Sequence, residues 1–369
     1  MVIKILKTAL NFLSLTANII IALLFIFAAY SDMVSPEKSM ILSYMGLLFP
    51  IFGFLNFLFL FYWIFLSRWK YLLVGLFTIL ICWGPIKSYI PIHSRTEVVP
   101  TENTIKVLTY NVMGFAYKNH TKEAPNQIIK YIAESDADIV CLQEYLVSNS
   151  EQHLSESKIR AALKMYPYSN TFFVNKNAKY KSGIAVYSKY PIVGSRKVKY
   201  DSENNGSTVH EVRVNDKKIL LINNHLESFK LTTEDKSNYS DFITNPGAES
   251  FDGLKGAFQQ KLGPAFLIRA KQARAIKEEV DNADDGAYVL VCGDFNDTPI
   301  SYAHRTILGG LLDAFAESGR GFGSTYNQNF FWFRIDKIFH SPNMKSFNCT
   351  VDKVDYSDHY PVWCYLQMD

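Results

Sequence analysis

Three long apolar runs near the amino terminus constrain this chain more than any other feature. Residues 9–30, 41–66 and 71–86 contain no Asp, Glu, Lys or Arg. The hydrocarbon core of a bilayer is about 30 Å thick, and a helix of about 20 apolar residues crosses it. The third run reaches this length only if the Lys87 ammonium extends to the membrane surface. The sequence therefore predicts a multi-pass membrane anchor in residues 1–92, with transmembrane helices near residues 9–30, 41–66 and 71–90.

The basic residues beside these runs predict the orientation of the anchor. Lys4 and Lys7 precede the first run, and Arg68 and Lys70 separate the second run from the third. Loops rich in Lys and Arg stay in the cytoplasm, so three spans place the chain after about Ile92 outside the cytoplasm. A cleaved signal peptide is the alternative interpretation of the first run, but signal peptides usually have a shorter apolar region.

Beyond the anchor, the chain is close to electrical neutrality. Residues 1–95 hold seven of the 38 Lys and Arg residues but only two of the 35 Asp and Glu residues. Surfaces that bind nucleic acid are usually basic, because contacts to phosphates dominate their affinity. A nucleic acid is therefore a disfavoured partner, although a local basic patch would still allow one. No obligate protein partner is inferred from the sequence.

The five cysteines lack the paired spacing of a zinc site. Cys141 and Cys292 lie inside apolar runs, which is typical of buried free thiols. Cys349 and Cys364 could face each other across a terminal hairpin, and outside the cytoplasm such a pair could form a disulfide. The sequence leaves this pairing open.

After a polar linker at residues 93–103, the pattern changes to short apolar runs that are each followed by polar residues. Runs of this length and composition predict strands buried in a sheet. Apolar residues at helical spacing predict amphipathic helices over residues 123–135 and 267–280. This mixture predicts an α/β domain over residues 104–369. The five strands end in the following polar residues: Asn111, Glu144, His225, Asp294 with Asn296, and Asp336.

One connection in this domain is unusually long, at residues 226–266. Connections longer than about 12–15 residues are uncommon in compact domains and are usually functional or disordered. We predict a mobile flap beside the substrate cleft, with a disordered surface loop as the alternative. The segment carries charges at Glu234, Asp235 and Lys236, and apolar side chains at Phe251, Leu254 and Phe258.

The polar residues that follow the strands are the types that phosphoester hydrolysis requires. This reaction needs a hard divalent cation, a positioned water and donors to the phosphoryl oxygens. Glu144 and Asp358 offer carboxylate oxygens of the kind that Mg²⁺ prefers. A histidine paired with a carboxylate, as His359 could be with Asp336, stays protonated near neutral pH. The candidate donors to phosphate are Asn111, Asn296, His225 and His359.

Seven short motifs in this part of the chain resemble, in content and order, those of the endonuclease/exonuclease/phosphatase superfamily. The resemblance covers about residues 104–367 and implies a four-layer sandwich of two β-sheets flanked by helices. It also implies that the strand ends meet at one metal-containing cleft. The motifs are residues 109–112, 142–144, 182–185, 223–226, 293–296, 334–336 and 357–361.

The resemblance implies a metal site and a substrate site. Glu144 would be the principal metal ligand, with Asp358 and Asn111 near the ion, which would be Mg²⁺ or alternatively Mn²⁺. Asn111 would also contact the substrate, together with Asn296 and Asn223. The Asn-x-His arrangement at residues 223–225 resembles the phosphatase, sphingomyelinase and deoxyribonuclease branches more than the abasic-site endonucleases.

The resemblance also implies four catalytic residues. Asp294 would orient or deprotonate the attacking water, and His225 would bind a phosphate oxygen. His359 would stabilise the transition state while Asp336 holds its ring. The alternative is that these residues have structural roles. Asp294 would then only form a turn, His225 would be a core histidine, and Asp336 would pair with Arg334.

These observations predict a membrane-anchored, divalent-metal-dependent phosphoester hydrolase, either a phosphodiesterase or a phosphatase. Its catalytic domain would act outside the cytoplasm, with lipid head groups among the candidate substrates. A membrane-tethered nuclease acting on DNA or RNA is the first alternative, because it would use the same chemistry. The second is a membrane protein that binds phosphorylated ligands without turnover, which the complete set of catalytic residue types argues against.

Overall fold

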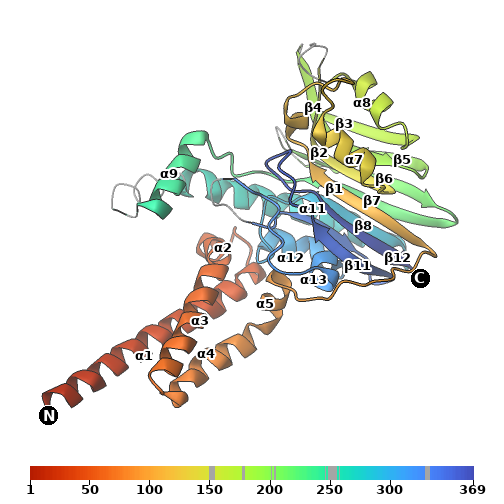
Figure 1. The fold of residues 1–369 in the computed structure, drawn as a ribbon. Helices are drawn as coiled ribbons and strands as arrows, with labels where there is room; N and C mark the ends of the chain where they lie inside the picture. Colours follow the sequence, from red (N-terminus) through yellow and green to blue (C-terminus); the bar gives the residue numbers. More distant parts are fainter. Residues whose placement is uncertain are drawn as a thin grey trace. The chain divides into compact units, whose positions relative to one another are not determined.

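The computed structural model describes residues 1–148, 154–176, 179–200, 202, 205–245, 247, 256, 258–328 and 333–369. The chain forms two compact units, which are described separately (Figure 1). The first unit comprises Met1–Tyr89 and Thr298–Arg305, and the second comprises Ile90–Asp297 and Thr306–Asp369.

The first unit is helical, and one of its helices is long and apolar enough to cross a membrane. This helix covers Val2–Met33, that is α1 and the short η1 that continues it. Two further pairs of helices meet the same test only when each pair is taken together, because each pair is bent, by 58° in one case and 64° in the other. Of the three transmembrane helices that the sequence predicted, the structure shows one as a single helix. The other two would be spans only if each bent pair is one broken span. The helices are α1 (Val2–Ala29), η1 (Ser31–Met33), α2 (Met40–Leu47), α3 (Phe49–Phe65), α4 (Trp69–Ile81) and α5 (Trp83–Tyr89).

Prolines explain why the two predicted spans are broken. Pro50 lies in the first turn of α3, and Pro85 lies in the first turn of α5. A proline lacks the backbone N–H that would bond to the carbonyl four residues earlier, so it favours the start of a helix over its interior. The carbonyl that Pro85 leaves without its usual donor is that of Ile81, and the hydroxyl of Tyr30 donates a hydrogen bond to it at 2.6 Å. Apolar periodicity alone did not reveal these breaks.

The second unit contains two mixed six-stranded sheets. Their strand orders are β11-β12-β1-β2-β4-β3 and β5-β6-β7-β8-β10-β9. Each sheet has one parallel pair near its centre, β1 with β2 and β7 with β8, and its other pairs are antiparallel. The first sheet consists of β1 (Thr104–Asn111), β2 (Ile139–Ser148), β3 (Tyr168–Lys176), β4 (Tyr180–Ser188), β11 (Met344–Val351) and β12 (Val362–Met368). The second consists of β5 (Ile192–Lys197), β6 (Gly206–Val214), β7 (Lys217–His225), β8 (Tyr288–Asp294), β9 (Leu312–Asp313) and β10 (Asp336–His340).

The two sheets pack face to face, with helices on the outside (Figure 1). One buried cluster joins Val107 and Cys141 of the first sheet to Leu221 and Cys292 of the second, so it lies between the sheets. A second cluster lies between the first sheet and the helices α7 and α8. This arrangement confirms the predicted α/β sandwich. The helices of this unit are α6 (Met113–Ala116), α7 (Gln127–Glu134), α8 (Glu156–Ala162), α9 (Thr233–Thr244), η2 (Phe258–Leu262), α11 (Gly263–Asp281) and α13 (Ala314–Ser318). A further helix, α12 (Tyr302–Leu308), begins in the first unit and ends in the second.

Two of the five predicted strand ends differ from the structure. The strand with Glu144 does not stop there, because β2 continues to Ser148. Asp336 does not end a strand but begins β10. The strands that carry Asn111, His225 and Asp294 end as predicted.

The predicted helices are present with shifted starts. The helix expected over residues 123–135 begins at Gln127, because the side chain of Asn126 caps it by accepting hydrogen bonds from the amides of Ile128 and Ile129. The helix expected from Leu267 begins earlier, at Gly263.

Cys349 and Cys364 lie on the neighbouring strands β11 and β12. Both are free buried thiols, so they form no disulfide in this structure.

Gly293 is a backbone position that only glycine fits. Its φ is +130°, and a Cβ placed there would lie 2.0 Å from the carbonyl oxygen of Asn224 on the neighbouring strand. This close approach lets β8 run against β7 immediately before Asp294. Any side chain at position 293 would push the two strands apart where the polar strand ends meet.

We expect Gly293→Ala to destabilise the protein, because it adds a clash to backbone strain that alone costs roughly 1–3 kcal/mol. Gly310→Ala is the matched control, since a Cβ there meets no atom within 4 Å, and it should change stability by less than about 0.5 kcal/mol. Thermal unfolding of the full chain in detergent measures both. Equal melting temperatures for the two variants would contradict this account.

Candidate active site

The parallel strand pairs of the two sheets bring their carboxyl ends together, and an amide side chain joins them. Asn111 ends β1 in the first sheet, and Asp294 ends β8 in the second. The Nδ2 of Asn111 donates to Oδ2 of Asp294 at 3.1 Å and to Oε1 of Glu144 at 3.2 Å. One neutral donor therefore holds two carboxylates from different sheets in a single cluster.

Glu144 reaches this cluster because β2 is bulged at that point. The register with β4 shifts between Leu142 and Tyr145, and Glu144 has a left-handed φ of 51°. A bulge leaves one residue out of the ladder and redirects its side chain, and non-glycine residues in this conformation store strain. The side chain of Glu144 is 39% exposed, so it can bind a ligand as well as the protein.

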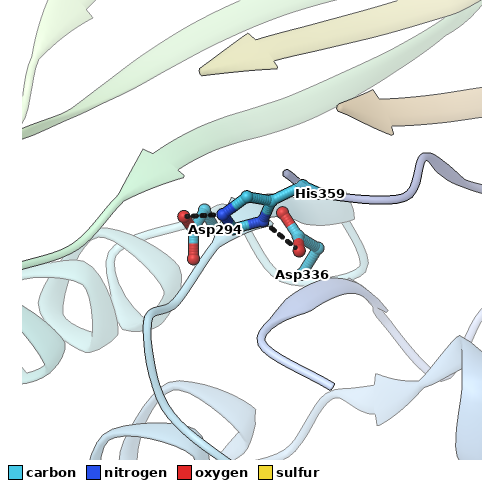
Figure 2. A group of neighbouring side chains, drawn as sticks. All are labelled: Asp294, Asp336 and His359. Atoms are coloured by element: carbon cyan, nitrogen blue, oxygen red, sulfur yellow. Dashed lines mark hydrogen bonds and ion pairs between the residues drawn. The ribbon is translucent and has the colours of Figure 1, made fainter. Parts of the chain in front are cut away.

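A histidine lies between two carboxylates beside this cluster (Figure 2). Antiparallel pairing of β8 with β10 places Asp336 opposite Asp294. His359 approaches from the loop before β12, with Nδ1 2.8 Å from Oδ2 of Asp336 and Nε2 3.8 Å from Oδ2 of Asp294. Burial alone would lower the pKa of His359, but the carboxylates of Asp336 and Asp294 outweigh it and raise that pKa to about 10. The ring is therefore a cation at neutral pH.

Two sets of residues could hold a divalent ion. Ligand atoms of Asp294, Asp336 and His359 lie within 4.8 Å of one another. The second set is Glu144 with Asp358, where burial raises the pKa of Asp358 and the negative charge of Glu144 raises it further. A divalent cation would relieve this repulsion, and hard cations prefer carboxylate oxygens. In the first set, an ion on His359 would have to displace a ring proton that two carboxylates stabilise.

His225 and Asn296 lie at the same cluster. The Nε2 of His225 is 3.8 Å from both Oε1 of Glu144 and Oδ2 of Asp294. It is buried and has no hydrogen-bond partner in the described part of the chain. Asn296 has a left-handed φ of 51°, and its backbone N–H donates to Oδ1 of Asp294 at 2.8 Å. The His225 ring is thus a donor or acceptor without a protein partner, at the position where a phosphate oxygen was expected.

Sequence comparison agrees with this geometry. Residues 108–359, more than half of the chain, match the model of the Endonuclease/Exonuclease/phosphatase family. The chain belongs to this family. Enzymes of the superfamily are generally phosphoester hydrolases. Residues 10–89 match a second family, described as a Domain of unknown function (DUF8431). No curated protein matches the chain in sequence.

Several solved structures are similar to this chain in fold. An endonuclease/exonuclease/phosphatase from Bacteroides vulgatus is 19% identical to this chain, with a TM-score of 0.49. The match covers 73% of this chain and 100% of that one. One from Beutenbergia cavernae is 17% identical, with a TM-score of 0.48 and 72% coverage of both chains. Beta toxin from Staphylococcus aureus is 18% identical, with a TM-score of 0.46, and covers 70% of this chain and 99% of its own. Similarity at this level says nothing about the substrate.

Two of the predicted contacts differ in the structure. Asn223 is fully buried between the sheets, where its Oδ1 accepts from Nε2 of Gln143 at 2.7 Å and its Nδ2 donates to the carbonyl of Ala185 at 3.1 Å. This position fits a link between sheets rather than a substrate contact. The Oδ1 of Asn111 accepts from the amide of Met113 at 3.1 Å, so Asn111 turns its donors, not its oxygen, toward the predicted metal site.

Sequence reasoning missed the residues that hold the segment after His225. Arg269 and Gln272 lie one turn apart on α11 and bind both backbone groups of Glu227, with Nη1 of Arg269 donating to its carbonyl and Oε1 of Gln272 accepting from its N–H. Arg269 also donates to Oδ2 of Asp297 at 3.0 Å. It thereby ties the segment after His225 to the turn after Asp294. Only its helical position was visible in the sequence.

The flap prediction is partly tested by the structure. The connection contains α9, η2 and the first residues of α11, so much of it is helical rather than irregular. Phe251 and Leu254 lie outside the described residues, as does the side chain of Phe258. The predicted apolar contact with a substrate or membrane therefore stays a prediction.

The charge on His359 depends on Asp336, and this can be measured without knowing a substrate. In metal-free protein, Asp336→Asn removes the carboxylate that bonds Nδ1, so the ring should lose its proton at a pH well below the present value of about 10. Histidine-selective isotope labelling and NMR titration give this pKa.

Glu317→Gln is the matched control for this variant, because the Glu317 carboxylate bonds His340, a different histidine, at 2.9 Å. It should leave the His359 titration unchanged. If Asp336→Asn leaves the pKa of His359 near 10, the hydrogen bond does not stabilise the cation.

Proposed function

We propose that the chain is a membrane-anchored, divalent-metal-dependent phosphoester hydrolase. The observation that carries this proposal is the cluster in which Nε2 of His225 lies 3.8 Å from a carboxylate oxygen of Glu144 and from one of Asp294. The cationic His359 lies beside it, 3.8 Å from the same oxygen of Asp294. These residues come from both sheets and from far-apart positions in the chain, so a structural role for each one alone does not account for their convergence. Membership of the family supports the same reaction class.

The residues divide the chemistry among them. Bound by Glu144 and Asp358, Mg²⁺ or Mn²⁺ would neutralise charge on the phosphoryl oxygens. Asp294 orients the attacking water and accepts its proton, since its Oδ2 lies 3.8 Å from the ring nitrogens of both His225 and His359, which are assigned to the phosphoryl group. The His359 cation stabilises the developing negative charge of the transition state, and Asp336 holds its ring. His225 contributes a ring nitrogen to a phosphoryl oxygen.

We place the substrate outside the cytoplasm and favour a lipid head group or a small phosphoester over nucleic acid. The distribution of Lys and Arg around the apolar runs supports this orientation. The near-neutral charge of the chain beyond the anchor supports the choice against nucleic acid. A tethered nuclease remains the alternative, since DNA and RNA contain the same bond.

The experiment that tests the proposal is a hydrolysis screen of the full chain in detergent, with Mg²⁺, with Mn²⁺ and with a chelator. The substrates are 4-nitrophenyl phosphate, bis(4-nitrophenyl) phosphate, phospholipids, sphingomyelin and DNA. Turnover that requires the metal, on at least one substrate, is expected. Absence of metal-dependent turnover across this panel would contradict the proposal.

Asp294→Asn should reduce turnover roughly 10²–10⁴-fold, the usual contribution of a positioned base. The change keeps the shape of the side chain but removes the negative charge that accepts the proton. The exposed Asp285 provides a matched control, and Asp285→Asn should retain wild-type activity. Near-normal turnover by purified Asp294→Asn would remove Asp294 from the mechanism.

Orientation can be tested apart from chemistry. A pair of reporters fused after Asp369, one active only in the cytoplasm and one active only outside it, gives the side of the carboxyl terminus. The proposal predicts activity of the external reporter alone. A cytoplasmic signal would show an even number of spans and would redirect the search to intracellular substrates.

A further inference from the structure

The connection after His225 carries a lysine to the edge of the active site. Lys236 lies in α9, which Figure 1 shows outside the two sheets. Its Nζ donates to the hydroxyl of Tyr326 at 2.8 Å and lies 5.5 Å from the centre of that ring. In the described part of the chain, no ion pair joins Lys236 to a carboxylate. Its charge acts on the Asp358 carboxylate without forming an ion pair with it.

Tyr326 is fixed beside the catalytic histidine. Its ring centre is 5.1 Å from that of His359, with the two planes 68° apart. The backbones of these two residues form an antiparallel bridge, and the next amide, that of Asn327, donates to the carbonyl of Asp358 at 3.2 Å. The hydroxyl that receives Lys236 thus belongs to a segment paired with the residues of the site.

The pair offers two donors to a ligand. Because the Tyr326 oxygen accepts from Lys236, its own proton stays available for donation. The ammonium of Lys236 has three N–H groups and uses one of them here. Two donors, one of them charged, therefore lie next to His359.

The start of α9 is held in a defined position. Thr232 and Asp235 form a reciprocal capping box, in which each side chain bonds the backbone N–H of the other. The same Asp235 carboxylate forms an ion pair with Lys261 of η2. These contacts fix the first turn of α9, from which Lys236 extends, and leave the ammonium of Lys236 free of the acidic residue beside it.

We propose that Lys236 and Tyr326 form a second anion-binding position, and that the enzyme prefers phosphoesters that carry another phosphate next to the scissile one. His225, His359 and an ion that Glu144 and Asp358 would hold are assigned to the scissile phosphoryl group, whereas Lys236 and Tyr326 come from segments that hold none of these residues. A charged donor and a neutral donor side by side are suited to an oxyanion, because charge-assisted hydrogen bonds are the stronger kind. The preference in hydrolysis rests on the proposed function, but anion binding by Lys236 and Tyr326 can be tested alone.

The binding test compares two ligands that differ by one phosphate, thymidine 3′,5′-bisphosphate and thymidine 5′-monophosphate. Calorimetry uses the full chain in detergent, with Ca²⁺ in place of Mg²⁺ to limit turnover. Wild type should bind the bisphosphate more tightly. Lys236→Gln should weaken bisphosphate binding roughly ten-fold, equivalent to about 1.4 kcal/mol, and change monophosphate binding by less than about two-fold. Lys236→Arg should restore the preference.

Two further variants separate this role from a general loss of charge or fold. Tyr326→Phe keeps the ring against His359 but removes the hydroxyl, and should also reduce the preference for the bisphosphate. Lys218→Gln removes an exposed lysine that pairs with Glu211, and should leave both affinities unchanged. Equal weakening of both ligands by Lys236→Gln, no weakening of either, or no preference in the wild type would each overturn the inference.

A turnover test separates this inference from the proposed function. The substrates are the 4-nitrophenyl ester of thymidine 5′-phosphate with and without a 3′-phosphate. The expected result is that Lys236→Gln raises the KM of the 3′-phosphorylated ester about ten-fold and changes the KM of the other ester by less than about two-fold. Hydrolysis of both esters without any preference would refute the inference while sustaining the proposed function. Selective binding of the bisphosphate without hydrolysis of either ester would sustain the binding position and refute the proposed function.

Discussion

The active site depends on amide side chains that hold the two sheets in register at one edge. Asn111 bonds carboxylates from both sheets, and Asn223 bonds Gln143 across the interior. A slip of one residue in any of these strands would turn each polar side chain to the opposite face. The close approach of β8 to β7 at Gly293 adds to this constraint, because the backbone there leaves no room for a side chain. The geometry of the candidate site is therefore a consequence of sheet packing.

This packing separates two kinds of carboxylate. Asp336 and Asp294 lie on either side of a buried histidine and hold it as a cation. Glu144 lies in a bulge of its strand and is partly exposed, and its negative charge raises the pKa of Asp358. Asp336 and Asp294 stabilise the positive charge of His359, whereas Glu144 and Asp358 are suited to bind a metal cation. Both charges are what a phosphoryl transition state requires.

Much of this site could be predicted from the sequence, because apolar runs ending in polar residues mark parallel strands whose ends meet. What could not be predicted depends on tertiary contacts. Nothing local shows that β2 continues past Glu144 through a bulge or that Asp336 begins its strand. The buried position of Asn223 follows from facing strands, and the pairing of Lys236 with Tyr326 joins segments far apart in the chain. In the first unit, Pro50 and Pro85 lie where bends interrupt two helices that apolar composition alone had predicted.

The proposed metal site is tested most directly by the position of a divalent ion relative to these two sets of carboxylates. Crystals of the full chain soaked with Mn²⁺ would locate the ion by its anomalous scattering. We expect a peak in contact with the carboxylates of Glu144 and Asp358, with the hydrogen bond between His359 and Asp336 intact. A peak held instead by Asp294, Asp336 and His359 would contradict this expectation, because the histidine would then be a metal ligand and not a cation.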